Sequence, residues 1–426
     1  MVTGKLYEGA YAATLESGMR LLVEEVPTSR SVSVGIWVKV GSRDDPAPAS
    51  GLAHALEHLL FKGTTSRDAL RIAQEIDAVG GHLNGATGEE ATFLYADVPS
   101  DGVETALELL SDLVLHPAFD PSALEKERGV ILEEIRGFED DPEQYAFELF
   151  NGDLWEAGHP LSRSVLGERS TIERLTPDQA AAHHCLYYRP EKMVLVACGA
   201  VDARRVVEMA ERLFPAYPPS GEVSPRVAPH LSKGRAFHER ETGQTHLYLG
   251  LPGAPAADPD RIALEVVNAV LGGGPSSRLF RLIREDRGLA YAVSSTATYY
   301  SDVGAWIVYA GVGPEHVGEV AEIALQEVRR LAKDGLSLDD LALARAKLRG
   351  GLILSLESNP GRMVRLGGTA VAGRKILSPD ELITRVERIT GEDTSRAIAR
   401  FARLDEARLS VIGPRTDGVE KVLAES

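Results

Sequence analysis

The order of predicted helices and strands in the first half of the chain recurs in the second half, and this repeat restricts the fold more than any other feature. In the first half the order is strand, two helices, two strands and two helices, at 32–40, 51–60, 66–79, 82–86, 91–98, 101–116 and 121–138. In the second half the same order falls at 245–251, 259–271, 277–286, 290–298, 303–312, 315–332 and 338–356, an offset of about 210–217 residues. A period of this length is too long for a solenoid and indicates duplication of a whole unit.

Each copy mixes strands with helices, so the predicted class is α+β. We expect two homologous α/β sandwich domains of about 200 residues, each a mainly antiparallel sheet covered by helices. The stretch after Phe214 is rich in Pro, Gly and Ser and is the expected linker. The predicted domains are therefore 1–217 and 235–426, joined by a linker at 218–234.

Composition excludes several classes of function. The chain has 426 residues and a formal charge of −17, which disfavours binding to nucleic acid or to an anionic membrane surface. It contains no apolar run of about 18 residues, so no membrane span is expected. The first residues lack the apolar stretch of a signal peptide. Two cysteines are too few for a disulfide scaffold, and we therefore expect a cytoplasmic protein.

The segment 51–60, Gly-Leu-Ala-His-Ala-Leu-Glu-His-Leu-Leu, carries the most informative local pattern. In a helix, His54, Glu57 and His58 stand at i, i+3 and i+4 and share one face. Ser50 is the predicted N-cap. The opposite face holds three leucines suited to a core, Leu52, Leu56 and Leu59. Two imidazoles and a carboxylate on one face indicate a binding site; the alternative is a surface helix with two solvated histidines.

Two imidazoles one turn apart can hold a single zinc ion at about 2.0–2.1 Å each, and catalytic zinc takes a third protein ligand. The helix 122–138 offers that ligand. Glu127 and Glu134 lie seven residues apart inside its apolar arc, whereas Glu125 and Glu133 lie outside it. The arc itself consists of Leu124, Val130, Ile131, Ile135 and Phe138. A carboxylate on a buried stripe needs a partner, so we expect one of the two to ligate the metal and the other to orient an imidazole.

Glu57 is then placed to act as the general base. It can take a proton from a water molecule whose pKa the metal has lowered, and pass it to the leaving amine. The predicted reaction is hydrolysis of a peptide bond. The equivalent helix in the second copy, 262–270, has no histidine, so we expect one Zn²⁺ per chain.

The order His-x-x-Glu-His is the inverse of the common zinc-protease motif. With its context, the chain resembles the pitrilysin/insulinase family, in particular two-domain bacterial members similar to the mitochondrial processing peptidase. The resemblance spans nearly the whole chain. Its motifs are Gly51–Thr64, Val130–Ile135 with Glu139–Pro142, His159–Leu161, Leu271–Phe280 and Arg284–Tyr291.

The resemblance implies a role for individual residues. His54, His58 and Glu134 match the zinc ligands, Glu57 matches the base, and Glu127 matches an acidic residue that supports the site. Asn84 and Ala86 fall on an edge strand along which substrate lies as an added β-strand. Arg284 and Tyr291 match a pair in the second domain that binds the substrate carbonyl and stabilises the developing oxyanion.

The resemblance also implies a closed chamber made by two chains, in which peptides or unfolded segments are cleaved. This chain carries both the zinc motif and the Arg/Tyr pair, which favours an active homodimer. A heterodimer with a homologous subunit, or a non-catalytic subunit, is the alternative. Ala55, Gly85 and Ala86 depart from the residues common in the family. The resemblance therefore does not specify the shape of the substrate pocket.

Two other patterns have simpler interpretations, and one other class of hydrolase is not supported. His183-His184-Cys185 is interpreted as structural, although it resembles a metal cluster. Gly272-Gly273-Gly274 is interpreted as a turn between helices, because no Lys-Ser/Thr pair follows it. A hydrolase with a serine or cysteine nucleophile finds no support, since the chain has no Gly-x-Ser-x-Gly motif.

Overall fold

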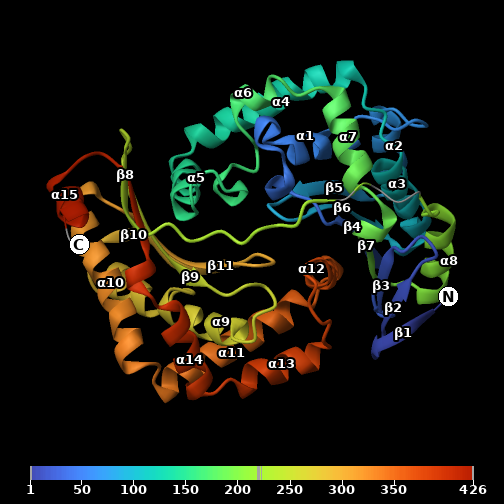
Figure 1. Ribbon diagram of the computed structural model, residues 1–426. Helices are drawn as coiled ribbons and strands as arrows, with labels where there is room; N and C mark the ends of the chain where they lie inside the picture. The colour runs from blue at the N-terminus through green and yellow to red at the C-terminus, as the bar shows by residue number, and fades with distance from the viewer. Residues whose placement is uncertain (1, 218–220, 222, 425–426) are drawn as a thin grey trace. The chain divides into compact units, whose positions relative to one another are not determined.

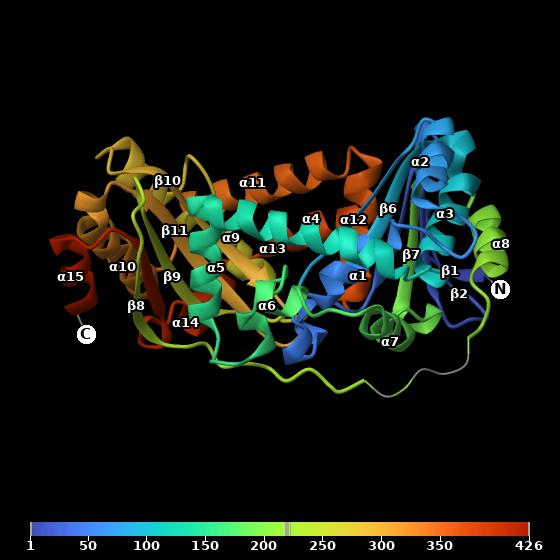
Figure 2. The ribbon, with the colours of Figure 1, turned by 90° about the horizontal axis from the view of Figure 1, so that it is seen from above.

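The computed structural model describes residues 2–217, 221 and 223–424. Residues 218–220 and 222 of the predicted linker therefore lie outside the described part of the chain. The chain divides into two compact units, each built around its own sheet (Figure 1 and Figure 2). Unit 1 consists of Met1–Arg136, Arg163–Arg226 and Leu354–Ser378, and unit 2 consists of Gly137–Ser162, Val227–Ile353 and Pro379–Ser426. Among the described residues, no helix is long and apolar enough to cross a membrane.

The sheet of unit 1 has seven strands in the order β1-β2-β3-β7-β4-β6-β5. Their bounds are β1 Val2–Tyr7, β2 Ala10–Thr14, β3 Arg20–Glu25, β4 Ser31–Val38, β5 His82–Thr87, β6 Thr92–Pro99 and β7 Met193–Gly199. β3 and β7 run parallel, and the other neighbouring strands are antiparallel. β7 is buried along its whole length, which explains its unbroken apolar sequence.

The sheet of unit 2 has five strands in the order β10-β11-β9-β12-β8. Their bounds are β8 Gly234–Glu239, β9 Thr245–Gly253, β10 Ala290–Tyr299, β11 Gly304–Val312 and β12 Arg408–Gly413. Read from its other edge, this sheet has the order β8-β12-β9-β11-β10, which matches the order β3-β7-β4-β6-β5 in unit 1. The only parallel pair in each of these five-strand sets is the first one, β8 with β12 and β3 with β7. The predicted duplication and the predicted α+β class are thus confirmed, and β5 and β10 are equivalent edge strands.

Helices cover one face of the unit 1 sheet and bury a continuous apolar core with it. They are α1 Leu52–Leu60, α2 Ala69–Ala78, α3 Val103–Leu115, α4 Pro121–Asp140, α6 Arg169–Ile172, α7 Pro177–Tyr187 and α8 Ala203–Leu213. Alternate residues of β4, such as Val34 and Ile36, point into this core. Their neighbour Trp37 points to the opposite face.

Unit 2 has the same layered construction. Its main core lies between the sheet and α9 Arg261–Leu271, α10 Val317–Asp334, α14 Gly391–Phe401 and α15 Asp417–Ala424. α11 (Leu338–Ser355) packs on α9 through Leu341 and Ala344, and α13 (Pro379–Arg388) also contacts α9. The predicted helix at 277–286 is a π-helical segment, η6, at Phe280–Glu285.

The second face of each sheet is covered by a helix from the other half of the chain. α5 (Pro142–Leu154) packs on the sheet of unit 2, where Phe150 and Leu154 are buried. α12 (Asn359–Val371) packs on the sheet of unit 1, where Met363 and Leu366 are buried. The compact units therefore differ from the predicted domains 1–217 and 235–426 at these two segments. The periodicity of an amphipathic helix shows that one face is buried, but not which sheet buries it.

Candidate metal centre

α1 begins at a sharp turn that positions the histidine motif. Gly51 adopts a left-handed conformation with φ 89°, and a Cβ atom there would lie 2.6 Å from the carbonyl oxygen of Leu166. The N-cap predicted at Ser50 is wrong, because Gly51 holds that position. The carboxylate of Asp45 instead accepts hydrogen bonds from the backbone N–H groups of Gly51 and Ala53, at 2.9 and 3.0 Å. Burial raises the pKa of Asp45 to about 7.

Side chains from α1 and α4 converge to form a group that could hold a metal ion. One donor atom from each of His54, His58 and Glu134 lies within 4.8 Å of the others. The Nε2 atoms of both histidines lie 3.6 Å from Oε2 of Glu134. This distance is long for a hydrogen bond, whereas two ligands of a tetrahedral zinc ion are about 3.4 Å apart. Two imidazoles and one carboxylate therefore fit zinc in both chemistry and spacing.

α4 brings two carboxylates to this group, Glu127 and Glu134, which lie seven residues apart on the helix. Glu127 is 5% exposed, and its Oε2 lies 3.0 Å from Nδ1 of His58. Its Oε1 lies 3.0 Å from Nζ of Lys62, so both oxygens have partners. The side chain of Glu134 is 40% exposed, although a buried stripe was predicted for it. Val130, also predicted for that stripe, is 49% exposed.

The buried stripe of α4 is narrower than the predicted arc. It consists of Leu124, Glu127, Ile131 and Ile135. Glu133 is exposed and pairs with Arg136, as expected for a solvated position. Because α4 leaves unit 1 after Arg136, the end of this helix does not need a wide apolar face toward the unit 1 core.

Burial and neighbouring charges set the protonation of the site. Burial, together with the nearby His58, lowers the pKa of His54 to about 4, so its imidazole is neutral at pH 7 and can donate a lone pair. Burial would also lower the pKa of His58, but the carboxylates of Glu134 and Glu127 outweigh it and raise that pKa. Burial raises the pKa of Glu57, against a hydrogen bond from Thr87 that lowers it.

The carboxylate of Glu57 faces the edge strand β5. The hydroxyl of Thr87 donates a hydrogen bond to Oε2 of Glu57 at 2.9 Å. A Cβ atom on Gly85 would lie 2.9 Å from Oε1 of Glu57, so the strand and the carboxylate are in close contact. On the same strand, Asn84 is exposed and Ala86 is half-buried. β5 therefore forms a wall beside Glu57, and its outer edge has no strand partner among the described residues.

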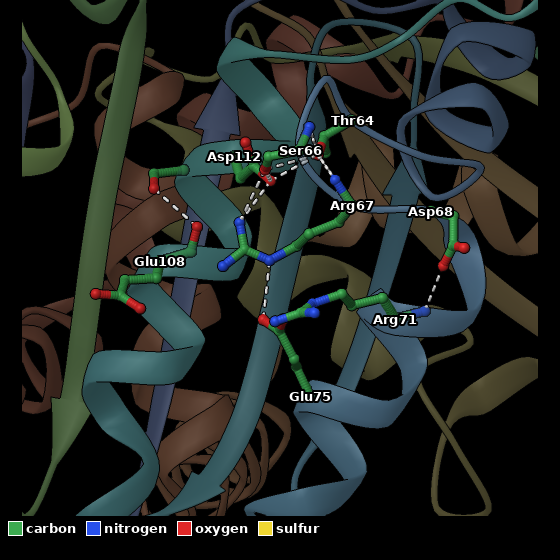
Figure 3. A network of polar contacts seen from close by, with 9 residues as sticks. Thr64, Ser66, Arg67, Asp68, Arg71, Glu75, Glu108 and Asp112 are labelled. Atoms are coloured by element: carbon green, nitrogen blue, oxygen red, sulfur yellow. Dashed lines mark hydrogen bonds and ion pairs between the residues drawn. The ribbon is translucent and has the colours of Figure 1, made fainter.

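A polar network fixes the loop that follows α1 (Figure 3). The carboxylate of Asp112 on α3 accepts hydrogen bonds from Thr64, Ser66 and Arg67 at 2.7, 2.9 and 2.7 Å. Arg67 also donates to Glu75 on α2 at 2.8 Å. The network ties the loop to two helices of the unit 1 core and so holds the end of α1.

Arg284 and Tyr291 belong to unit 2, whereas the histidines and Glu134 belong to unit 1. Arg284 lies on η6, and its guanidinium carbon is 5.5 Å from the ring centroid of Tyr291. Tyr291 lies at a bulge near the start of β10 and is 76% exposed. The fold thus brings these two predicted residues together as a pair.

Three neighbours of the site were not predicted from sequence: Asp45, Lys62 and Thr87. Only Lys62 left a signal, since it follows the histidine motif within residues 51–64, one of the stretches that carry the family resemblance. The structural interpretation of the His183 cluster fits its contacts. Nε2 of His184 lies 2.8 Å from the backbone oxygen of Val114, and burial lowers the pKa of His183 to about 4. Gly272 ends α9, as expected for a turn.

Two family models match the chain. The model described as insulinase (peptidase family M16) matches residues 20–169. The model described as peptidase M16 inactive domain matches residues 174–348. The second match includes α9, which carries no histidine.

Curated relatives match over nearly their whole length. An uncharacterized zinc protease of Mycobacterium tuberculosis is 38% identical over 408 residues, covering 94% of this chain and 92% of the relative. An uncharacterized zinc protease of Streptomyces coelicolor is 37% identical over 412 residues, covering 95% of this chain and 89% of the relative. An uncharacterized zinc protease of Bacillus subtilis is 32% identical over 401 residues, covering 94% of this chain and 97% of the relative.

Solved structures share the fold at low sequence identity. A protease from Helicobacter pylori matches with a TM-score of 0.88 at 20% identity, covering 95% of this chain and 99% of that chain. A peptidase M16 inactive domain from Pseudomonas fluorescens matches with a TM-score of 0.87 at 21% identity, covering 96% of this chain and 98% of that chain.

Proposed function

The chain belongs to the insulinase family, peptidase family M16, and on this premise we propose that it is a zinc-dependent endopeptidase acting on peptides or unfolded segments. The observation that carries the proposal is the convergence of His54, His58 and Glu134 on one point. This donor set is typical of catalytic zinc. The names of the relatives, zinc proteases, support the same activity.

The side chains around this point have separate tasks in peptide hydrolysis. A zinc ion held by His54, His58 and Glu134 would supply Lewis acidity for a water molecule and for the scissile carbonyl. Glu57, fixed by the hydroxyl of Thr87, accepts a proton from the attacking water and transfers it to the leaving amine. Its raised pKa suits a carboxyl that carries the proton between these two transfers. Glu127 holds Nδ1 of His58 and thereby orients the ring.

The edge strand β5 is the proposed docking place for substrate. An extended peptide that pairs with β5 is held through its backbone, so its sequence matters little. Asn84 and Ala86 are the residues of β5 that we expect to contact it. This position would bring a peptide bond beside Glu57, which Gly85 contacts closely.

We extend the proposal to a closed chamber formed by two chains. Arg284 and Tyr291 would bind the substrate carbonyl and stabilise the oxyanion that forms on it. One chain carries both this pair and the metal-binding group, which supports a homodimer with one zinc ion per chain. The family resemblance is the main support for this arrangement.

Cleavage of an internally quenched peptide library tests the activity. The purified chain alone should cleave it, and both a chelator and Glu57→Gln should abolish cleavage. Glu57→Gln should still bind zinc, because Glu57 is not one of the three proposed ligands. Zinc binding without cleavage of any peptide would contradict the proposal for the isolated chain, and substantial activity in Glu57→Gln would remove Glu57 as the base.

A mixing experiment tests the two-chain chamber. Arg284→Ala should reduce cleavage with zinc content unchanged. If each chamber takes its metal from one chain and its Arg284 from the other, mixing Arg284→Ala with Glu57→Gln restores one intact combination, and part of the activity returns. Absence of rescue in a mixture shown to exchange subunits would contradict the shared site.

A further inference from the structure

The sheet of unit 2 ends at β8, at a position where the sheet of unit 1 continues. In unit 1, β3 pairs with β7 on one side and with β2, in antiparallel orientation, on the other. β8 is the equivalent of β3, but among the described residues it pairs only with β12. It lies at the edge of its sheet, beside α15 (Figure 2). The duplication therefore indicates that this edge suits one more antiparallel strand.

Alternate residues of β8 direct their backbone groups away from the sheet. The N–H groups of Gly234 and Arg240 donate hydrogen bonds at 2.9 and 3.0 Å to backbone oxygens at the two ends of the β12 segment. Because this direction alternates along a strand, Arg235 and Phe237 direct their N–H and C=O groups to the free edge. An added strand can therefore form a regular ladder with β8.

Cations occupy two positions of the β8 segment that are apolar and buried in unit 1. Leu21 on β3 and Arg235 on β8 are equivalent, because each pairs with a buried leucine four residues before the glycine that ends the next strand. Two residues earlier, Met19 in unit 1 corresponds to Lys233 in unit 2. Both Met19 and Leu21 are fully buried. Unit 2 therefore has two positive charges where unit 1 buries two apolar side chains.

These cations line a hollow and have no ion-pair partner. Lys233 and Arg235 line a hollow of about 610 Å³, and no ion pair among the described residues includes either of them. Nη1 of Arg235 is buried without a hydrogen-bond partner among these residues. Lys421 on α15 lines an adjoining hollow together with Arg235 and also has no ion pair in the described part of the chain. In a chain with a formal charge of −17, three unpaired cations at one sheet edge favour an acidic ligand.

The carboxylates that line the two hollows already have partners. Asp405, in the larger hollow, accepts hydrogen bonds from Nε and Nη2 of Arg403 at 3.0 and 2.8 Å. Glu322, in the smaller one, accepts a hydrogen bond from Nε2 of Gln326 at 2.7 Å. Arg235 and the two lysines therefore keep their charge for a ligand.

Apart from these polar groups, the larger hollow has an apolar wall. Leu249 on β9, Leu325 on α10 and Leu409 on β12 form it, and all three are buried residues of the unit 2 core. In unit 1, Ala13 and Leu15 from the β2 segment are buried in the corresponding core. An added strand beside β8 would bury apolar surface in the same way, in addition to pairing with the cations.

We propose that β8 binds an extended acidic segment of a partner polypeptide as an added antiparallel strand. By analogy with residues 11–15 beside β3, the segment places an apolar residue opposite Phe237 and acidic residues opposite Arg235 and Lys233. The backbone ladder provides affinity, and the two carboxylates provide specificity through charge-assisted hydrogen bonds. An uncharged apolar strand would leave Arg235 without a partner, so the same cations select against it. The inference is independent of the proposed peptidase activity.

Binding of short labelled peptides tests the predicted pattern. The fluorescein-labelled acidic probe has the core sequence Val-Thr-Glu-Thr-Glu between flanking threonines, and its neutral counterpart is Val-Thr-Gln-Thr-Gln. Dissociation constants are measured by fluorescence anisotropy with the full chain carrying Glu57→Gln, which keeps the proposed peptidase site from cleaving the probe. We expect the acidic probe to bind roughly 5- to 20-fold more tightly than the neutral one at low salt, and this ratio should fall as salt is raised.

Modified peptides test strand pairing separately from charge. In the predicted register, the valine and the glutamates direct their N–H groups toward β8, and the two core threonines direct theirs away. N-methylation of the valine and the first glutamate should therefore weaken binding about tenfold or more, whereas N-methylation of the two core threonines should have little effect. The reversed sequence, Glu-Thr-Glu-Thr-Val, has the same charge but the wrong direction, and should bind no more tightly than the neutral peptide.

Variants of the chain assign the binding to β8. Arg235→Gln should reduce the ratio of acidic to neutral affinity about threefold. Arg235→Glu should make a probe with the core Val-Thr-Lys-Thr-Glu bind more tightly than Val-Thr-Glu-Thr-Glu. A peptide bound at β5 would not respond to either change. Thermal unfolding checks that both variants are folded.

Lys333→Gln is the matched control. Lys333 is exposed near the end of α10, the helix that contributes Leu325 to the larger hollow, and the affinity ratio should not change in this variant.

Several results would overturn the inference: no binding of the acidic probe, equal affinity for the acidic probe and its neutral or reversed counterpart, equal effects of the two N-methylation patterns, or a charge preference unaffected by both Arg235 variants. If light scattering shows a dimer of the chain that the acidic probe dissociates, the edge belongs to a second copy, and the inference is also overturned. Absence of cleavage in the peptidase assay would contradict the proposed function alone, because binding of the probe does not require it.

Discussion

Nδ1 of His58 lies 3.0 Å from Oε2 of Glu127. Glu127 is 5% exposed, and its second oxygen is held by Lys62. A neutral His58 that donates its Nδ1 proton to this carboxylate keeps the lone pair on Nε2, the atom that faces Glu134. The contact therefore determines both the tautomer and the orientation of a proposed metal ligand.

Glu127→Gln should weaken metal binding while leaving the three proposed ligands in place. An amide is a poorer acceptor for the Nδ1 proton and also loses the ion pair with Lys62, so we expect affinity for zinc to fall about 10- to 100-fold. Competition with a fluorescent chelator measures this affinity. Glu133→Gln is the control, since Glu133 is exposed on the same helix and pairs with Arg136. Equal affinities in the two variants would show that Glu127 does not support the site.

Gly85→Ala should reduce activity more than stability. The new Cβ atom would lie 2.9 Å from Oε1 of Glu57 and 3.0 Å from Cε2 of Phe61, so the carboxylate must move. We expect kcat/KM to fall roughly 10- to 100-fold. Gly88→Ala is the control, because a Cβ atom there meets only the oxygen of Ala91 at 3.7 Å. Thermal unfolding checks stability, and similar kinetics for both variants would refute the role of this contact.

Gly367→Ala tests how closely α12 must approach the sheet of unit 1. A Cβ atom at Gly367 would lie 2.4 Å from Cε2 of Trp37, which is 3% exposed and cannot move freely. We expect a loss of about 1–3 kcal/mol in the free energy of unfolding by urea. In Gly368→Ala the new Cβ atom would have no neighbour within 4 Å. This variant should therefore leave the free energy of unfolding unchanged or raise it by up to about 1 kcal/mol. Equal effects at these adjacent positions would mean that the packing of α12 on Trp37 is not tight.

The Asp112 network should make stability depend on pH. Burial raises the pKa of Asp112, but hydrogen bonds from Thr64, Arg67 and Ser66 outweigh it, and the pKa in the folded state lies below the ordinary value of 3.8. Its stabilising contribution is therefore complete above about pH 5 and is lost as pH falls through the folded-state pKa. Asp112→Asn should cost about 1–2 kcal/mol at pH 7.

Urea unfolding at a series of pH values measures this difference, which should narrow as pH falls from 7 towards 3. Asp77→Asn is the control, because Asp77 is exposed on α2 and lies outside the network. A difference between Asp112→Asn and the unsubstituted chain that stays constant with pH would indicate a packing effect rather than loss of a charged acceptor.

The local features of the site could be predicted because they depend on residues close in sequence. The spacing of His54, Glu57 and His58 alone puts them on one face of a helix. The presence of two buried or partly buried carboxylates on 122–138 followed from the same reasoning. That reasoning could not choose between Glu127 and Glu134, because both lie on one face, and only the approach of α1 distinguishes the carboxylate near both Nε2 atoms from the one near Nδ1.

Long-range packing decided the features that the sequence did not reveal. Thr87 and Glu57 are 30 residues apart, and no periodicity connects them. Asp45 replaces the predicted cap at Ser50 because Gly51, in a left-handed turn, takes the N-cap position, and its N–H group donates to the carboxylate of Asp45 six residues earlier. The exchange of α5 and α12 between the two units also depends on which sheet each apolar face meets.

The sequence by itself determined the duplicated α+β unit, the helix that carries the His-x-x-Glu-His motif and the family, because secondary-structure patterns and motif spacing depend on residues close together in the sequence. The tertiary structure alone decided which carboxylate meets which imidazole nitrogen, how closely Gly85 approaches Glu57, and which helix covers each sheet. These arrangements depend on contacts between segments far apart in sequence, where burial of apolar surface favours one pairing over others that the same local patterns would allow.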